Sequence, residues 1–331
     1  MRIALIGVSH WHAPMYYRPL AKLPGRSIVG VSDPVPAALR RAQDELGTPG
    51  YADYRELVEA EKPDFAFVFG RHCDMAASAA WLIERGVPFI VEKPAGLNAS
   101  AVASLRDRAA ARGLHVGTGF SLRVGDFARE VLALAREEPV TWASFRFIAG
   151  SPDRYAKDGC AWMLDPALSG GGSTINLSVH FFDLFRLFTG GPAAEVSALM
   201  GNHTFGLPIE DYSSVSLRSP SAACNVQTGY TLLGPSGGWD ISYCVRTTKH
   251  YVVARSDNVI EIRSADGGLR EIRTASVGNG YWYPAFVRES LERFERGEPP
   301  VAGLDDLVAA MKVVDAAYAS SRSAGARAAA N

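Results

Sequence analysis

The chain has almost no net charge and few cysteines, and each of these features excludes some classes of function. Its formal net charge at pH 7 is −1, so a polyanionic partner such as a nucleic acid is not indicated. It has 4 cysteines in 331 residues and no C-x-x-C pair, which is typical of a reducing compartment and predicts no structural zinc or other metal site. We therefore expect a cytoplasmic protein without disulfides.

The chain also has no hydrophobic run long enough to cross a membrane. Its most apolar stretch, residues 181–188, is interrupted by Asp183 and Arg186, which favours a buried helix. The apolar residues at 3–6 are too few for a signal peptide. We expect no membrane partner. A hydrophobic content of 47% and a charged content of 21% are ordinary for a globular protein of one or two domains.

The first third of the chain alternates short apolar runs with helical patterns. This alternation is typical of βαβ units and predicts a parallel sheet with right-handed crossovers. The predicted strands are residues 2–6, 27–32, 64–68, 88–91 and 115–119, and the main predicted helices are 13–23, 36–46, 74–84 and 99–111.

The pattern changes after about residue 120. A series of strand candidates between residues 195 and 273, separated by Gly, Pro, Asn and Asp, predicts a large, open, mostly antiparallel sheet. We therefore predict an α/β protein with a nucleotide-binding domain at 1–120 and an α+β domain for substrate binding and oligomerisation at 121–331. The alternative for the final helix at 304–321 is that it packs back on the first domain. Residues 325–331 are predicted to fray.

A damaged dinucleotide-binding motif follows the first predicted strand. The fingerprint G-x-G-x-x-G begins with Gly7, but Ser9 and His12 replace its second and third glycines. The position of this motif supports a dinucleotide site, because its loop joins a strand to a helix and Asp33 ends the second strand. A carboxylate there accepts hydrogen bonds from a ribose and repels a 2′-phosphate, which predicts NAD(H) over NADP. The alternative is that Asp33 only forms a turn before a helix.

His10 and Trp11 lie inside this damaged motif. If the loop keeps its usual course, we expect both side chains near the pyrophosphate or the nicotinamide, among the cofactor-binding residues. The alternative is that the two rings plug the dinucleotide site.

Two further segments carry residues suited to proton transfer. Glu92 and Lys93 end an apolar strand-like run, and a lysine at that end of a parallel strand faces the ligand crevice. Asn176 and His180 are four residues apart on a helix that follows a glycine run, so we expect them to share a face. Lys93 and His180 are predicted catalytic residues, assisted by Asn176. The alternatives are a solvated lysine and a core histidine.

Four other side chains are candidates for substrate binding. Arg123 follows the fifth predicted strand and either lines the cleft or pairs with a carboxylate. Trp162 and Asp165 precede the glycine run and form a candidate sugar-binding wall. Tyr281 offers an aromatic face of the kind that suits carbohydrate C–H groups, although loop packing is an equally simple explanation.

These residues occur within a longer series of motifs that resembles the Gfo/Idh/MocA oxidoreductases. The series consists of DP at 33–34, YADYREL at 51–57, EKP at 92–94, GFSLR at 119–123, SGGG at 169–172, HFFD at 180–183 and GLDD at 303–306. The resemblance covers nearly the whole chain. It implies an N-terminal Rossmann domain, a C-terminal domain whose open sheet often forms a homodimer or homotetramer, and catalysis by the lysine of E-K-P together with residues of the glycine-led helix.

The chain departs from the family pattern at several of these positions. Asn176 stands where the family usually has aspartate, and Met75 where it has histidine. The loop that opens with Phe69 and Gly70 also differs; we count both residues, with Glu92, among those that bind the cofactor.

The resulting hypothesis is an NAD(H)-dependent oxidoreductase acting on a sugar, cyclitol or related polyol. One alternative is a catalytically altered relative that serves as a ligand sensor or regulatory subunit, which Ser9, His12 and Asn176 favour. Another is a redox-assisted lyase or glycosidase, which the family resemblance allows.

Overall fold

The computed structural model describes residues 1–234, 238–324 and 328–329, and they form two compact units. Unit 1 consists of Met1–Phe120, Tyr155–Gly170 and Tyr283–Val308. Unit 2 consists of Ser121–Arg154, Gly171–Trp282 and the described residues from Ala309 onward. The chain first leaves unit 1 at the predicted boundary, but two later segments return to it. The sequence prediction allowed only the final helix at 304–321 to join the first domain. In the structure the returning segments are Tyr155–Gly170 and Tyr283–Val308, and most of that helix belongs to unit 2.

Unit 1 contains a six-stranded parallel sheet, as predicted for the first third of the chain. The order of its strands is β3 (Gly50–Tyr51), β2 (Ser27–Ser32), β1 (Arg2–Ile6), β4 (Phe65–Val68), β5 (Phe89–Val91) and β6 (Val116–Thr118). The order reverses direction between β1 and β4, which is the point where doubly wound sheets bind ligands. The two-residue strand β3 is the one member that the sequence did not predict.

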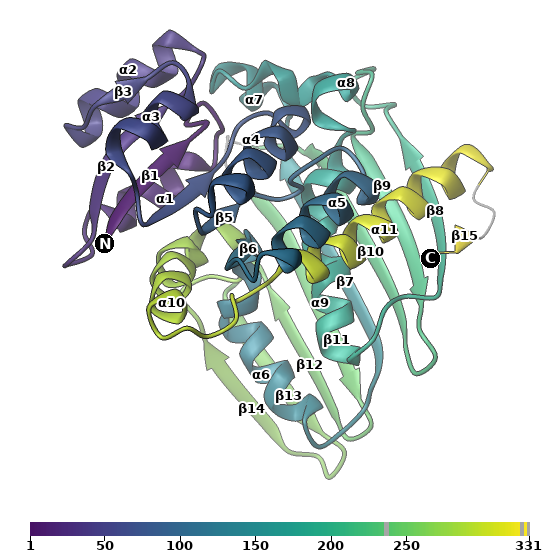
Figure 1. The fold of residues 1–331 in the computed structure, drawn as a ribbon. Coiled ribbons are helices and arrows are strands. Elements are labelled where there is room, and N and C mark those ends of the chain that lie inside the picture. The colour runs from purple at the N-terminus through teal and green to yellow at the C-terminus, as the bar shows by residue number, and fades with distance from the viewer. Residues whose placement is uncertain (235–237, 325–327, 330–331) are drawn as a thin grey trace. The chain divides into compact units, whose positions relative to one another are not determined.

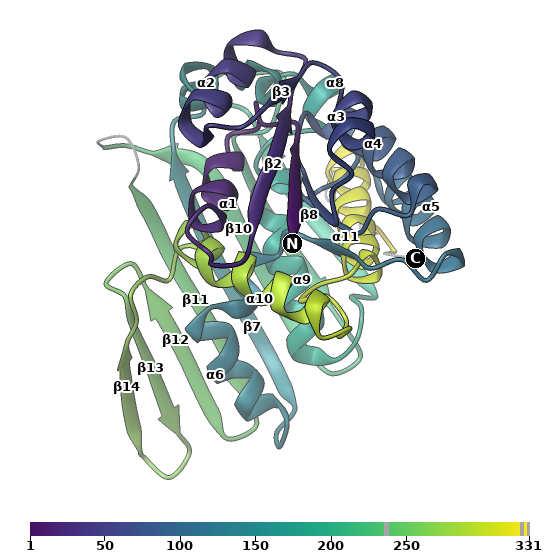
Figure 2. The same ribbon diagram turned by 60° about the vertical axis from the view of Figure 1, so that its left-hand side comes forward.

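Helices cover both faces of this sheet. Figure 2 shows α1 on one side of β1 and β2, and α3 and α4 on the other. Because both faces are covered, the strands are continuous apolar runs rather than alternating ones. The helices wholly within unit 1 are α1 (Ala13–Leu20), α2 (Pro36–Leu46), α3 (Tyr54–Glu61), α4 (His72–Arg85), α5 (Ala99–Ala111), α8 (Pro166–Ser169) and α10 (Tyr283–Glu295), with a 3₁₀ turn at Ala161–Leu164.

Side-chain caps and glycines set the ends of these helices. The Asp53 carboxylate accepts from the N–H of Arg55 at the start of α3, and the Asn98 amide oxygen caps α5. Helices α2 and α4 end at Gly47 and Gly86, both with the positive φ that glycine adopts without strain.

Unit 2 contains a nine-stranded sheet that is mostly antiparallel, which confirms the predicted fold class. One internal pair, β7 with β10, is parallel. Strand β15 lies within the segment predicted to fray; the rest of that segment lies outside the described residues. In spatial order the strands are β14 (Leu269–Arg273), β13 (Val259–Ser264), β12 (His250–Arg255), β11 (Trp239–Thr247), β7 (Val140–Gly150), β10 (Ala223–Leu232), β9 (Tyr212–Arg218), β8 (Glu195–Gly201) and β15 (Ala328–Ala329).

Helices α6 and α9 lie on one face of this sheet (Figure 1). The π-helix Thr174–Ser178 runs directly into α9 (Val179–Thr189), and α6 spans Asp126–Ala135. Short 3₁₀ turns occupy Ser121–Val124 and Asn279–Trp282. Two helices cross the division between units, α7 (Asp153–Lys157) and α11 (Leu304–Arg322). Among the described residues, no helix has both the length and the apolar character needed to span a membrane.

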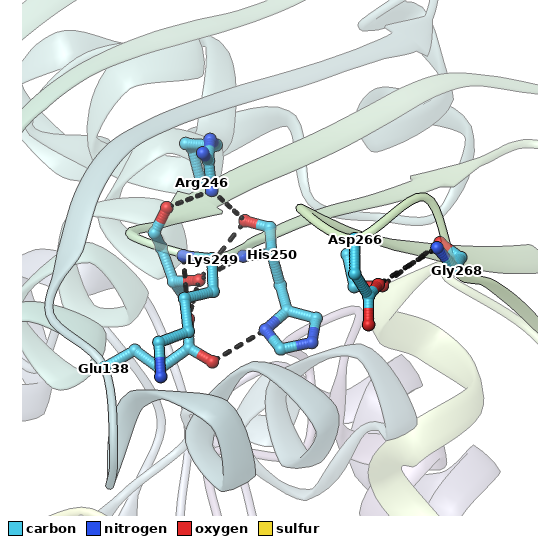
Figure 3. Close-up of polar contacts among 8 residues, drawn as sticks. Glu138, Arg246, Lys249, His250, Asp266 and Gly268 are labelled. Atoms are coloured by element: carbon cyan, nitrogen blue, oxygen red, sulfur yellow. Dashed lines mark hydrogen bonds and ion pairs between the residues drawn. The ribbon is translucent and has the colours of Figure 1, made fainter.

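A buried carboxylate fixes one end of the nine-stranded sheet. Figure 3 shows the Glu138 side chain directed at the ring of His250, whose Nδ1 lies 2.7 Å from Oε1 of Glu138. The same carboxylate accepts from the backbone N–H of Lys249 at 3.0 Å and from the hydroxyl of Thr247. These bonds hold the β11–β12 turn against the start of β7, which makes the cluster a structural one.

Candidate functional site

A cavity of about 680 Å³ lies at the carboxyl ends of β1, β2 and β4 in unit 1. It is at the point where the strand order reverses, as expected for a dinucleotide site. Of the predicted cofactor-binding residues, those that line it are Gly7, Ser9, Asp33, Phe69 and Gly70. Its wall also includes Arg55, Arg71, Cys73, Gly159 and Trp162.

Gly7 is required where the chain leaves β1. Its φ is +79°, and a Cβ at this position would lie 2.6 Å from the carbonyl carbon of Phe69 and 2.7 Å from the nitrogen of Gly70. Both distances are far below van der Waals contact, so a side chain here would push β4 away from β1. The first glycine of the motif therefore survives because the backbones of two strand ends meet at it.

Asp33 organises the loop that follows Gly7. Its Oδ2 accepts from the N–H of Ser9 at 2.7 Å and its Oδ1 accepts from the N–H of Val35 at 2.8 Å. The residue is buried but still lines the cavity. Each carboxylate oxygen has a second lone pair, so Asp33 can hold the loop and accept a further hydrogen bond from a ribose hydroxyl.

His12 is accommodated at the third motif position by polar partners inside unit 1. The imidazole is buried, with Nδ1 2.9 Å from Oε1 of Glu92 and 3.2 Å from the hydroxyl of Tyr283. Tyr16 donates to the other oxygen of Glu92. Glu92 is thus held by two residues from the loop and the first helix, and its contacts are internal to unit 1.

His10 and Trp11 do not line the cavity, so the alternative that they plug it is not supported. The His10 ring is buried, and its Nδ1 accepts from the N–H of His12 at 3.0 Å. The Trp11 ring packs on His12 at a tilt of 48° with a centroid separation of 3.8 Å, and it meets Tyr155 edge-on. The Trp11 ring belongs to the packing beneath the loop, and the His10 ring lies beside Trp162, which lines the cavity.

Lys93 follows β5 and is 1% exposed. Burial lowers the pKa of its ammonium from 10.5 to about 8, and the neighbouring Glu92 carboxylate opposes the change. Burial also raises the pKa of Glu92, against the attraction of Lys93 and His10. Lys93 therefore titrates close to neutral pH, which is unusual for a lysine and frequent at functional sites.

Three imidazoles surround this lysine within unit 1. Burial is the largest cause that lowers the pKa of His10, His12 and His72, and repulsion from Lys93 adds to it in each case. For His72 the pKa falls to about 3. All three rings are therefore neutral at physiological pH. His72 was not predicted as a site residue, because one histidine in a helical pattern gives no signal of its own.

In unit 2, His180 lies on α9 and is buried against a small cavity lined by Leu122, Phe147, Leu177 and Phe181. Asn176 lies in the π-helix and donates from Nδ2 to the hydroxyl of Tyr230 at 2.9 Å. The prediction that Asn176 and His180 share a face assumed a regular α-helix. The structure instead has a π turn at Asn176 that leads into the α-helix carrying His180. Four residues still make close to one turn of such a helix, so the shared face stays a prediction.

Glu210 holds the glycine run that precedes the π-helix. Its carboxylate accepts from the N–H groups of Gly172 and Thr174 at 2.9 and 2.8 Å, and from the hydroxyl of Tyr318 at 2.8 Å. A Cβ on Gly172 would lie 2.0 Å from the carbonyl oxygen of Glu210, which explains glycine at that position. Glu210 was not predicted, because it is distant from the glycine run along the chain.

The predicted substrate residues have different surroundings. The Arg123 guanidinium forms a buried ion pair with Asp183, at 2.8 Å from Nε to Oδ2. The Asp165 carboxylate caps α8 through the N–H of Ala167, and Tyr281 is exposed. Trp162 lines the cavity of unit 1. Within the described ranges no group of three or more His, Cys, Asp or Glu side chains is arranged to hold a metal ion.

Comparison with known proteins defines the class and then the family. Residues 1–120 match the model of an oxidoreductase family with an NAD-binding Rossmann fold, so the first third belongs to a class of NAD-binding oxidoreductases. Residues 139–253 match the C-terminal domain model of the same family. The chain is a member of the Gfo/Idh/MocA family of oxidoreductases. This confirms the predicted family, the predicted enzyme class and the NAD cofactor.

One relative is similar in sequence and several solved structures are similar in fold. D-xylose 1-dehydrogenase (NADP(+)) 2 of Haloferax volcanii is 25% identical over 309 residues, which is 86% of either chain. An oxidoreductase from Agrobacterium radiobacter, solved with NAD+, L-tartaric acid and magnesium, has a TM-score of 0.88 at 17% identity and covers 100% of this chain and 98% of its own. Levoglucosan dehydrogenase with NADH and levoglucosan has a TM-score of 0.88 at 13% identity, covering 100% and 99%.

Proposed function

We propose that this protein transfers a hydride between NAD(H) and a sugar, cyclitol or related polyol, and that Lys93 and His180 handle the proton. The observation that carries this proposal is the buried ammonium of Lys93, with a pKa near 8, at the carboxyl edge of the sheet whose other strand ends form the cavity. Burying a charge costs free energy, so a lysine buried there indicates a functional role at the carboxyl edge of the sheet.

Lys93 suits the stabilisation of charge on a reacting oxygen. An ammonium held in a dry environment before the reaction begins interacts with a developing alkoxide more strongly than it would in water. Its lowered pKa also makes the proton easier to release near neutral pH. His180 is the proposed proton acceptor, since imidazole titrates in the physiological range. Asn176 is uncharged, so it adds hydrogen bonding without adding charge.

The residues of unit 1 fit a dinucleotide. Gly7 allows close backbone approach at the strand end, and the acidic side chain of Asp33 lies at the cavity wall. When bound, NAD+ supplies the hydride acceptor. We propose that Asp33 makes NAD the preferred form, because its carboxylate repels a 2′-phosphate. The Haloferax relative is named for NADP(+), so this preference is a point for direct measurement.

The substrate class rests on the relatives. One is a D-xylose dehydrogenase and another was solved with levoglucosan, so both act on or bind carbohydrates. The aromatic wall provided by Trp162 is consistent with such a substrate.

A direct test measures NADH formation at 340 nm with a panel of D-xylose, levoglucosan, myo-inositol and linear polyols, each with NAD+ and with NADP+. We expect turnover with at least one member. Lys93→Met should lower it by about 10²-fold or more, as loss of a preorganised donor does, while the exposed Lys22→Met is the matched control. Binding of NAD(H) without turnover of any member would contradict the proposal and favour the sensor alternative.

We further propose that the chain forms a homodimer or homotetramer through its nine-stranded sheet. Trp142, Leu199 and Trp239 on three of its strands are exposed, and the Trp142 ring stacks on Tyr251 at 6.4 Å between centroids. Exposed aromatic groups of this kind are common at interfaces. Light scattering after size exclusion tests this directly; a monomer would contradict it.

We also propose a cytoplasmic location. The four free cysteines of the chain support it.

A further inference from the structure

Three rings in unit 1, two of them buried, lie close together beside the dinucleotide cavity. The centroids of His10, His72 and Trp162 are separated by 6.2 Å (His10–His72), 5.7 Å (His10–Trp162) and 5.0 Å (His72–Trp162). The Nε2 atoms of both histidines and the Nε1 of Trp162 are buried and have no hydrogen-bond partner among the described residues. Both histidines are almost completely buried, at 1% and 0% exposure. Buried polar nitrogens rarely lack partners, and three of them together indicate a ligand.

The hydrogen bonds of the two histidines fix opposite tautomers. Nδ1 of His72 lies 2.6 Å from the carbonyl oxygen of Ser169, which only accepts, so this Nδ1 carries the proton. Nδ1 of His10 accepts from the N–H of His12 at 3.0 Å, so here the proton is on Nε2. Because both rings are neutral, the Nε2 of His72 is a hydrogen-bond acceptor and the Nε2–H of His10 is a donor.

The cluster adjoins the proposed site. Trp162 lines the dinucleotide cavity, as do Ser9 next to His10 and both neighbours of His72 along the chain. Both histidines are also close enough to Lys93 for its charge to lower their pKa values. A group held by these rings would therefore lie beside the cavity, within reach of the field of the ammonium.

We infer that His10 and His72 bind one hydroxyl group of the substrate, which donates to Nε2 of His72 and accepts from the Nε2–H of His10, with Trp162 as a second donor beside it. A single oxygen bonded to two nitrogens requires them to lie within about 6 Å of each other. The centroids of the two rings are 6.2 Å apart, so Nε2 atoms on the facing sides of the rings meet this requirement. The inference rests on the proposed function and assigns it two substrate-positioning residues.

A carboxamide has the same pair of donor and acceptor groups, so the nicotinamide amide is the other possible source of this chemistry. The two sources differ in which Michaelis constant depends on the histidines. A substrate hydroxyl predicts a change in the KM of the sugar, whereas the nicotinamide predicts a change in the KM of the dinucleotide.

Asparagine variants separate the ligand contact from the structural one. In His72→Asn the amide nitrogen replaces Nδ1 and keeps the bond to Ser169, but nothing replaces Nε2. In His10→Asn the amide oxygen replaces Nδ1 and keeps the bond from His12, again without Nε2. The exposed His203→Asn is the matched control. The panel member with the highest kcat/KM is the probe, used with NAD+.

Each asparagine variant should raise the KM of the sugar about tenfold, the effect of one lost hydrogen bond, with the KM of NAD+ within about twofold of wild type. The deoxy analogue that lacks the contacted hydroxyl should show the same increase in the wild type and no further increase in His72→Asn. In ¹⁵N-histidine spectra of the wild type, His10 should have its proton on Nε2 and His72 on Nδ1.

Unchanged sugar KM in both variants, a change confined to the KM of NAD+, or the opposite tautomers would overturn the inference while leaving the proposed function intact. If no panel sugar is turned over, the proposed function fails and this inference fails with it.

Discussion

Replacing Lys93 with methionine should make the protein more stable and nearly inactive. The pKa of the ammonium falls from 10.5 to about 8 because of burial. Each tenfold change in proton affinity corresponds to about 1.4 kcal/mol, so holding the charged form in the folded state costs about 3 kcal/mol at pH 7. Methionine has a similar length and no charge, so Lys93→Met should recover much of this cost. Turnover should fall by about 10²-fold or more.

The pH dependence of this gain follows from which state holds the proton. Below pH 8 both the folded and the unfolded chain are protonated at Lys93, and the full cost applies. Between pH 8 and 10.5 the folded state releases its proton while the unfolded state keeps it, so the cost declines; above 10.5 it is absent. The stability gained by Lys93→Met should therefore be largest at pH 7 and should decrease to about 2 kcal/mol at pH 9.

Urea unfolding followed by circular dichroism at pH 7 and pH 9 measures both values. Lys93 also favours the charged form of Glu92. Part of the stability gained by Lys93→Met is lost if the Glu92 carboxylate stays charged without the lysine beside it. The double variant with Glu92→Gln isolates this contribution. The exposed Lys22→Met should change stability little at either pH. A Lys93→Met protein that is less stable than wild type, or whose gain does not decrease with pH, would refute the account of a buried charge.

Three further predictions concern other named residues. Asp33→Ser should shift the NAD:NADP affinity ratio toward NADP by about tenfold, a typical cost for close like charges, in titrations of tryptophan fluorescence; an unchanged ratio would remove Asp33 from cofactor choice. Arg123→Met should destabilise the protein by about 3–5 kcal/mol because it leaves Asp183 charged and buried, and the added substitution Asp183→Leu should restore much of the loss in urea unfolding. Asn176→Asp should raise the pKa of His180, which moves the acidic limb of the pH–rate profile to higher pH; an unmoved limb would mean that His180 is not the titrating base.

The fold was predictable from the sequence where local signals agree with packing. The strands of unit 1 are continuous apolar runs, and the helices between them end at glycines such as Gly47 and Gly86. Strand β3 was not predictable, because Gly50 and Tyr51 gain their extended form from pairing with Val31 and Ser32 rather than from their own pattern. The return of residues 155–170 and of α10 to unit 1 was not predicted for a similar reason: no local pattern encodes it.

The site was predictable where a residue's position along a strand assigns its place in space. Gly7 and Asp33 line the cavity because they follow β1 and β2, and Lys93 was identified in the same way from β5. Other features depend on three-dimensional contacts that a sequence does not show. The π turn at 174–178 has the same apolar pattern as an α-helix, and His72 becomes notable only when His10 and Trp162 are found beside it.

The substitution that damages the dinucleotide fingerprint is also part of the environment of Lys93. His12 occupies the third glycine position, and its ring and Tyr16 bind the two oxygens of Glu92, the neighbour of Lys93. The His12 imidazole is neutral, so it orients the Glu92 carboxylate without adding any charge near Lys93. Glu92 alone then opposes the effect of burial on Lys93, which leaves the pKa of the lysine near 8. A further carboxylate at this position would raise that pKa and make the proton harder to release. The residue that replaces a glycine of the nucleotide-binding motif thus belongs to the surroundings that set the pKa of the lysine we propose for proton transfer.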